Sequence, residues 1–240
     1  MGQAKPELVP DVSQRDIEIA YSFTGAELLL FGAIVYPGGR TPSAGERPAE
    51  IVVVVKGPTE SVLVREKSKV AGIWVNAAQM RYRSAPSFYA IASSRPIRQL
   101  VDERTRAIYE LGLDSLQLSP ASGATPQVQQ RFDSGLVELK TRSGLFYEAP
   151  GAVEITGGVL YRARLTIPAR VPVGRFTAET FLIRDGRVLA AAVRPIEIRK
   201  SGFERFVAIS ADQHAIGYGL VAVAVSFLFG WGAGALWRRF

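Results

Sequence analysis

Four arginines, Arg81, Arg83, Arg95 and Arg98, are the side chains in this sequence best suited to bind a ligand. Arginine presents a planar set of N–H donors that matches the geometry of carboxylates, phosphates and other oxyanions. If residues 80–84 form a strand, Arg81 and Arg83 lie on one face, because side chains alternate along a strand. The group therefore predicts a site for an anion, a lipid headgroup or an acidic partner; the competing interpretation is an ordinary solvated face.

The sequence lacks the residues that most catalytic mechanisms need. The chain has no cysteine and a single histidine, His214. These counts exclude thiol catalysis and cysteine-ligated metals, and they argue against histidine metal clusters and a Ser-His-Asp triad. Asp102 and Glu103 lie among arginines, which is typical of ion pairs on a helix surface. We therefore expect no enzymatic activity, no catalytic residues, no cofactor and no metal site.

Two aromatic stretches are weaker candidates for recognition. Trp74 and Asn76 could form a contact loop, although a core tryptophan followed by a turn-forming asparagine is the favoured interpretation. Phe88 and Tyr89 could stack on a ligand, although core packing is again favoured. His214 could titrate near neutral pH, but we interpret it as a spectator at a membrane edge.

The composition is that of a folded chain. Of 240 residues, 48% are hydrophobic and 21% are charged, which allows one large all-β domain or two small ones. The formal net charge of +7 is scattered without basic blocks, so we expect no nucleic-acid partner.

Strand-like alternation of apolar and polar residues dominates the sequence. Asp185-Gly186 predicts a hairpin turn, because both residues tolerate positive φ. The expected strands are 17–23, 28–36, 51–55, 62–65, 70–76, 80–84, 88–92, 153–155, 161–167, 176–183, 187–193 and 196–198.

The segment between these two groups of strands is helical in pattern. A first helix is expected from Ser94 to Gly112, and a second from Thr125 to Gly144. The second has one apolar face, made of Val128, Phe132, Leu136 and Leu139.

The longest apolar stretch is at the C-terminal end. Residues 213–237 contain no Asp, Glu, Lys or Arg, and 216–237 supply 22 residues where a bilayer core needs about 20. Tyr218, Trp231 and Trp237 suit the membrane interfaces. The stretch predicts one transmembrane helix and the lipid bilayer as a partner. A buried helix of a soluble domain is the less favoured alternative.

Small residues recur every four positions along this helix, at Ala222, Ser226, Gly230 and Gly234. Such a stripe lets membrane helices approach closely. It predicts a helix-packing face for a second copy of the chain or for another membrane protein.

Arg238 and Arg239 directly follow the apolar stretch and favour a cytoplasmic C-terminus, with residues 1–212 outside. Residues 1–6 contain no leader, so we expect a trimmed leader or a late start position. A tail-anchored cytoplasmic domain is the alternative.

The fold class expected is mainly β: one or two immunoglobulin-like β-sandwiches with an inserted pair of helices, and one C-terminal transmembrane helix. The expected organisation is an N-terminal segment 1–14, a first β-rich part 15–93, a helical insert 94–145, a second β-rich part 146–200, a juxtamembrane linker 201–213, a transmembrane helix 214–237 and a basic tail 238–240.

Several short motifs, taken in order, resemble the alpha-proteobacterial putative transmembrane protein family. They are Val70–Asn76, Pro86–Ala90 with Ser93–Pro96, Pro168–Gly174 with Arg184–Gly186, and Gly202–Glu204 with Tyr218–Leu220. The resemblance extends from about Lys5 to the end of the chain. It implies a leader peptide, an external β-rich domain and one C-terminal anchor, and this chain lacks the leader. It carries no catalytic residues to this sequence.

These observations lead to two functional expectations. The first is a single-pass accessory or scaffold protein of the bacterial inner membrane, with a periplasmic β-sandwich beside a membrane partner. The resemblance implies a sulfite-exporter-like permease as that partner. The second is a sensor module that binds an anion through Arg81, Arg83, Arg95 and Arg98.

Overall fold

The computed structural model describes residues 6–19, 25–39, 42, 48–121, 123–200, 211 and 215–237. The chain divides into two compact units. The first, called the β domain here, holds residues 1–17 and 22–199, and the second holds 18–21 and 200–240. Tyr21, Phe23, His214, the linker 201–213 except residue 211, and the tail 238–240 lie outside the described residues.

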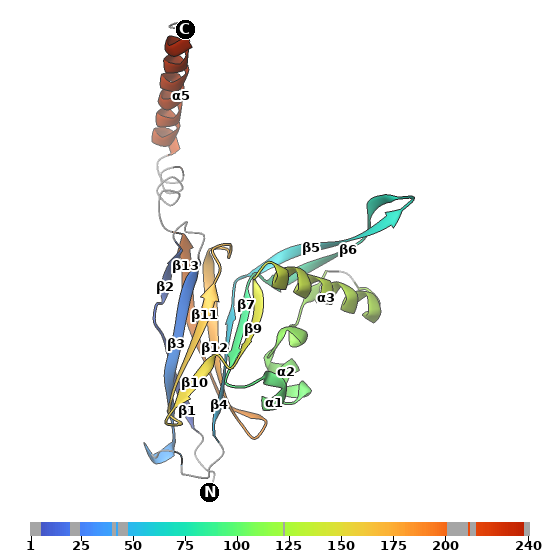
Figure 1. Ribbon diagram of the computed structural model, residues 1–240, viewed down its shortest axis with the longest axis vertical. Helices are drawn as coiled ribbons and strands as arrows, with labels where there is room; N and C mark the ends of the chain where they lie inside the picture. Colours follow the sequence, from blue (N-terminus) through green and yellow to red (C-terminus); the bar gives the residue numbers. More distant parts are fainter. Residues whose placement is uncertain are drawn as a thin grey trace. The chain divides into compact units, whose positions relative to one another are not determined.

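The β domain is built on three sheets, which confirms the mainly β prediction (Figure 1). The first sheet has the order β1 (Glu7–Val12), β3 (Ala26–Val35), β11 (Leu160–Ile167), β10 (Val153–Thr156). The second has the order β2 (Asp16–Ile19), β13 (Arg187–Lys200), β12 (Gly174–Arg184), β4 (Glu50–Lys56), β7 (Tyr89–Ser93), β9 (Phe146–Pro150). The third has the order β5 (Thr59–Val70), β6 (Ile73–Pro86), β8 (Ser119–Pro120).

The two larger sheets pack against each other as one sandwich. Strand β10 contacts β4, β11 contacts β7, and β1 contacts β12. Each of these sheets combines strands from before and after the helical segment, since β3 pairs with β11 and β4 pairs with β12. Of the two alternatives left open by the sequence, the structure therefore has a single sandwich. Residues 7–12, which the sequence assigned to a separate N-terminal segment, form its strand β1.

Strand β4 lies in the middle of the core. Its run of β-branched residues, Ile51 to Val55, has no exposed surface at any position. The strand lies between β12 and β7, so both of its edges are hydrogen-bonded. A strand covered on both faces needs apolar side chains at every position, which is the pattern that predicted it.

The helical insert is the crossover of a parallel strand pair. Strands β7 and β9 pair in parallel, from Tyr89 opposite Phe146 to Ser93 opposite Pro150. Two parallel neighbours need a long connection between them, and residues 94–145 provide it. The connection contains α1 (Ile97–Leu100), α2 (Glu103–Tyr109), the 3₁₀ turn η2 (Leu113–Ser115), β8 and α3 (Pro126–Arg142). A further 3₁₀ turn, η1 (Pro37–Gly39), follows β3.

The single helix expected from Ser94 to Gly112 is wrong, because the chain forms two short helices there. Val101 is extended, with φ of −144°, and it ends α1. Asp102 then begins α2, and its Oδ1 accepts a hydrogen bond from the Thr105 amide at 2.8 Å. Asp102 therefore caps α2; the hydrogen bonds from Thr105 lower the pKa of its carboxyl, and the charge of Arg104 lowers it further.

Helix α3 follows its prediction more closely. It begins at Pro126 and ends one residue before Ser143, and Phe132 and Leu136 are buried. Leu139 departs from the predicted apolar face, since 56% of it is exposed.

The strand predicted over residues 70–76 is wrong, because a hairpin turn divides it. Ala71 and Gly72 both have positive φ, 49° and 86°, and Val70 pairs directly with Ile73. This is the backbone of a tight two-residue hairpin turn. The three strands expected between residues 62 and 84 are thus two long strands, β5 and β6. The hairpin turn predicted at Asp185-Gly186 is confirmed, with φ of 52° and 75°.

Helix α5 (Ala215–Trp237) belongs to the second unit. The described side chains from 216 to 231 are all exposed. Within the part of the chain that the structure describes, no helix combines the length and the apolar character needed to cross a membrane. The transmembrane assignment of 214–237 therefore stays a prediction.

Candidate functional site

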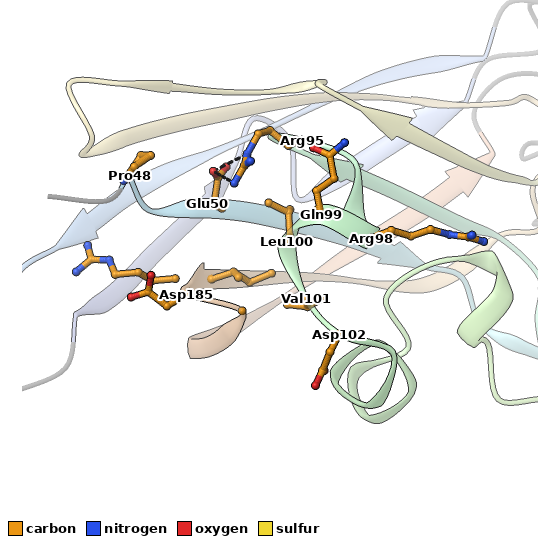
Figure 2. Close-up of a pocket in the computed structure, with 12 residues that line it drawn as sticks. Pro48, Glu50, Arg95, Arg98, Gln99, Leu100, Val101, Asp102 and Asp185 are labelled. Carbon is orange, nitrogen blue, oxygen red and sulfur yellow. Dashed lines mark hydrogen bonds and ion pairs between the residues drawn. The ribbon is translucent and has the colours of Figure 1, made fainter. Parts of the chain in front are cut away.

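One cavity of the β domain lies beside α1. Its volume is about 510 Å³, and we call it the α1 cavity. Its walls come from the start of β4, the segment from the end of β7 through α1, and the β12–β13 turn (Figure 2). The lining residues are Pro48, Glu50, Arg95, Arg98, Gln99, Leu100, Val101, Asp102, Ile183, Arg184, Asp185 and Gly186.

Arg95 is engaged inside this cavity by Glu50. One carboxylate oxygen of Glu50, Oε1, accepts from Arg95 Nε at 2.8 Å and from Nη2 at 2.7 Å. The other, Oε2, accepts from Ser94 Oγ at 2.5 Å. Glu50 is 9% exposed, so its charge needs these partners. Figure 2 shows the Arg95 side chain turned toward Glu50.

Arg98 is engaged by a different carboxylate. Its Nη2 forms an ion pair with Asp114 of η2, which ties α1 to the following turn. Figure 2 shows the Arg98 side chain extending away from the Glu50–Arg95 pair. Among the described residues, the cavity wall contains three arginines and three carboxylates, whose formal charges balance. A balanced wall attracts a free anion weakly.

Arg81 and Arg83 lie elsewhere, on β6. Both are exposed and Tyr82 between them is buried, so they share the face that the alternation predicted. Arg83 Nη2 donates to the Ala121 carbonyl at 2.9 Å, and the Ala121 amide donates to the Arg81 carbonyl at 2.7 Å. Neither residue lines the α1 cavity. The structure thus divides the four predicted arginines into two pairs, and anion binding stays a prediction.

Of the aromatic candidates, Phe88 and Tyr89 are core residues with no exposed surface, as favoured. The Tyr89 hydroxyl donates to the Glu110 carbonyl at 2.7 Å and accepts from the Gly112 amide at 3.0 Å. Burial raises the pKa of this hydroxyl above its usual range. Tyr89 therefore joins the second sheet to the turn after α2.

Trp74 contradicts its favoured interpretation as a core residue. It lies next to the β5–β6 turn and 65% of it is exposed. Ile73 beside it is 69% exposed. The sequence signal that could have shown this is the Ala-Gly pair, which allows a tight turn just before an apolar run.

The predicted helix-packing stripe lies along a groove on α5. The groove has a volume of about 470 Å³ and is lined by Ala222, Val223, Ser226, Phe227, Gly230 and Trp231. Gly234 lies one turn farther along the helix. The Ser226 hydroxyl donates to the Ala222 carbonyl of its own helix at 2.8 Å, so its donor is already used within the helix.

In the described part of the chain, no three His, Cys, Asp or Glu side chains are grouped to hold a metal ion.

Comparison with known proteins gives one clear result. No curated protein has a sequence that matches the chain. A protein-family model described as "Putative transmembrane protein (Alph_Pro_TM)" matches residues 7–239, which is nearly the whole sequence. The chain therefore belongs to this family of putative transmembrane proteins.

Proposed function

We propose that this protein is a membrane-anchored accessory subunit, in which α5 is the anchor and the β domain is presented beside an integral-membrane partner. The observation that carries the proposal is the character of α5. No Asp, Glu, Lys or Arg occurs from 213 to 237, and the described side chains of the helix from 216 to 231 are exposed. A charge-free helix whose described apolar side chains are exposed requires another apolar surrounding.

The groove on α5 supports a partner helix. Its wall combines the small residues Ala222, Ser226 and Gly230 with the larger Phe227 and Trp231. A Cβ added at Gly230 would meet no described atom within 4 Å, apart from its two chain neighbours and the backbone of its own helix. The space is therefore open to a second helix, and lipid-embedded helices associate where small residues allow close approach.

The α1 cavity supports a presenting role for the β domain. Its described wall residues include arginines and carboxylates in equal number, and Glu50 holds Arg95 in place. Following the flanking Arg238 and Arg239, we place this domain on the periplasmic side of the bacterial inner membrane, with the C-terminus in the cytoplasm. The family resemblance suggests a sulfite-exporter-like permease as partner.

Two variants of the full-length chain test the packing face. Gly230→Leu with Gly234→Leu fills the groove side, while Val221→Ile with Leu228→Ile changes exposed apolar residues of the same helix. In a membrane two-hybrid assay, the first pair should abolish association with a co-purifying membrane protein or with a second copy. The second pair should leave it intact.

Membrane extraction tests the anchor separately. The full-length chain should remain in the bilayer after alkaline carbonate washing of isolated membranes, because a spanning helix resists extraction. Release of the chain into the wash would overturn the anchor. Equal association of both double variants would overturn the groove as the interface and leave α5 as a simple anchor.

A further inference from the structure

The β5–β6 hairpin has an exposed apolar end that the accessory role does not explain. Residues 67–77, which we call the hairpin tip, contain the Ala71-Gly72 turn and the last four residue pairs of the hairpin. Within it, Val70 is 57% exposed, Ile73 69%, Trp74 65% and Val75 40%. Contiguous exposed side chains of this kind mark an interaction surface.

We propose that the hairpin tip binds the interface of a bilayer that contains anionic phospholipids. The pairing register shows how its side chains are divided between two faces. Val70 lies opposite Ile73, and Ser68 lies opposite Val75, so these residues share one face that is nearly all apolar. On the other face, Lys69 lies opposite Trp74 and Lys67 lies opposite Asn76.

The positive charge of the tip favours anionic lipid as its ligand. The tip carries Lys67 and Lys69 and no acidic residue. Glu66, the nearest carboxylate along the chain, forms an ion pair with Arg131 of α3 at 3.1 Å. Lysines near an anionic bilayer are attracted to it, and each contributes roughly a fivefold change in binding. Tryptophan beside lysine is the combination that the headgroup layer favours, because the indole ring is amphipathic and the lysine can reach phosphates.

The base of the same hairpin is held firmly against α3. Val64, Met80, Tyr82 and Ala85 are buried with Phe132 and Leu136 of that helix. The Tyr82 hydroxyl donates to Asp133 Oδ1 at 2.6 Å, and Lys140 forms an ion pair with Glu60. Figure 1 shows the hairpin continuing past the part that faces α3, to an end with no neighbouring element of the β domain. The base of the hairpin is thus packed against α3, whereas its apolar tip extends beyond this packing.

This inference goes beyond the proposed anchor, because the tip is a second membrane contact made by the β domain itself. Tight insertion is unnecessary for such a contact. A tethered surface meets the bilayer at a high effective concentration, so a weak affinity suffices.

Single-cysteine labelling tests the inference on the full-length chain, which has no cysteine of its own. Ile73→Cys places an environment-sensitive dye on the tip, and Gln79→Cys places it at an exposed position on the supported part of β6. Ser226→Cys reports on α5 independently. Each labelled protein is reconstituted into vesicles of phosphatidylcholine alone or with 30% phosphatidylglycerol, with nitroxide-labelled lipid as quencher.

We expect quenching and a blue shift at position 73 in the anionic vesicles, and neither at position 79. Lys67→Gln with Lys69→Gln should lower the ratio of bound to free tip by about 30-fold, since the two lysine contributions multiply. Raising the ionic strength should have the same effect, because salt screens the attraction. An unchanged unfolding temperature controls for misfolding of the lysine variant.

The outcomes separate the tip from the anchor. Quenching at 226 without quenching at 73 overturns the inference and leaves the proposed anchor standing. Quenching at 73 without quenching at 226 supports the tip and contradicts the anchor. A dye response at 73 that needs native membrane proteins, or that appears in lipid-free detergent as the protein concentration rises, identifies a protein partner or a second copy and also overturns the inference.

Discussion

Replacing Tyr89 by phenylalanine should destabilise the β domain far more than the same change at Tyr147. Both hydroxyls make two backbone hydrogen bonds. Tyr89 donates to the Glu110 carbonyl and accepts from the Gly112 amide, at 2.7 and 3.0 Å. Tyr147 donates to the Thr166 carbonyl and accepts from the Thr166 amide, at 3.0 and 2.9 Å. The chemistry removed is therefore the same, and only the surroundings differ.

The surroundings set the magnitude. Tyr89 has no exposed surface, so its loss leaves two backbone groups without water to replace the hydroxyl. An unsatisfied buried group costs about 1–3 kcal/mol, and we expect a loss of about 3 kcal/mol in the free energy of unfolding for Tyr89→Phe. Tyr147 is partly exposed, so water can reach the groups it leaves, and we expect about 1 kcal/mol or less.

Thermal unfolding of the full-length protein in detergent, followed by circular dichroism, measures both changes. For a domain of this size, 1 kcal/mol corresponds to a shift in Tm of about 2–4 °C, so Tyr89→Phe should lower Tm by about 6–12 °C. Far-ultraviolet spectra of both variants should match the parent below the transition. Equal losses at the two positions would refute the argument that burial sets the cost of these bonds.

Two further predictions concern pH and packing. Burial raises the pKa of Tyr147 to about 12, so the stability that this residue contributes is complete below pH 10 and is lost as the pH rises from about 10 to 12. Unfolding curves recorded across that interval should show that the Tm of the parent protein falls as the pH rises. The Tm of Tyr147→Phe should fall less steeply. Leu136→Ala should cost about 2–5 kcal/mol, because Leu136 is buried against the hairpin, whereas Leu139→Ala, at a 56% exposed position, should cost less than about 0.5 kcal/mol. Urea denaturation distinguishes the two, and similar costs would contradict the packing of α3.

The sequence predicted those elements whose own residues determine them. The run from Ile51 to Val55 can only be satisfied by burial on both faces, and Asp185-Gly186 fits a turn of positive φ wherever it occurs. Helix α3 likewise has its proline start and its apolar face within 17 residues. In each case the local pattern and the final environment agree.

The parts that were missed depend on partners distant in sequence. Leu139 fits the helical period of α3, yet it is exposed and lies outside the cluster in which Phe132 and Leu136 pack against the hairpin. Trp74 resembles a core residue because large aromatic residues are usually buried; the Ala71-Gly72 pair indicates a turn beside it, but how far β5 and β6 extend beyond α3 depends on tertiary packing. Arg95 and Arg98 could be recognised as candidates, but their carboxylate partners, Glu50 and Asp114, are fixed by tertiary structure.

The pairing of early strands with late strands in both large sheets has a consequence for how the chain folds. Leu30 of β3 pairs with Ala163 of β11, and Val53 of β4 pairs with Thr180 of β12, so each sheet closes only over very long loops. Loops of that length slow folding, because the chain loses conformational entropy when a loop closes, before native contacts compensate for the loss. Until the last strands arrive, the β-branched run of β4 has an unpaired edge, which is the condition under which chains aggregate. We therefore expect residues 51–55 to be the segment most prone to aggregate before β12 pairs with β4, and a break anywhere in the helical crossover would leave two fragments that each lack half of both large sheets.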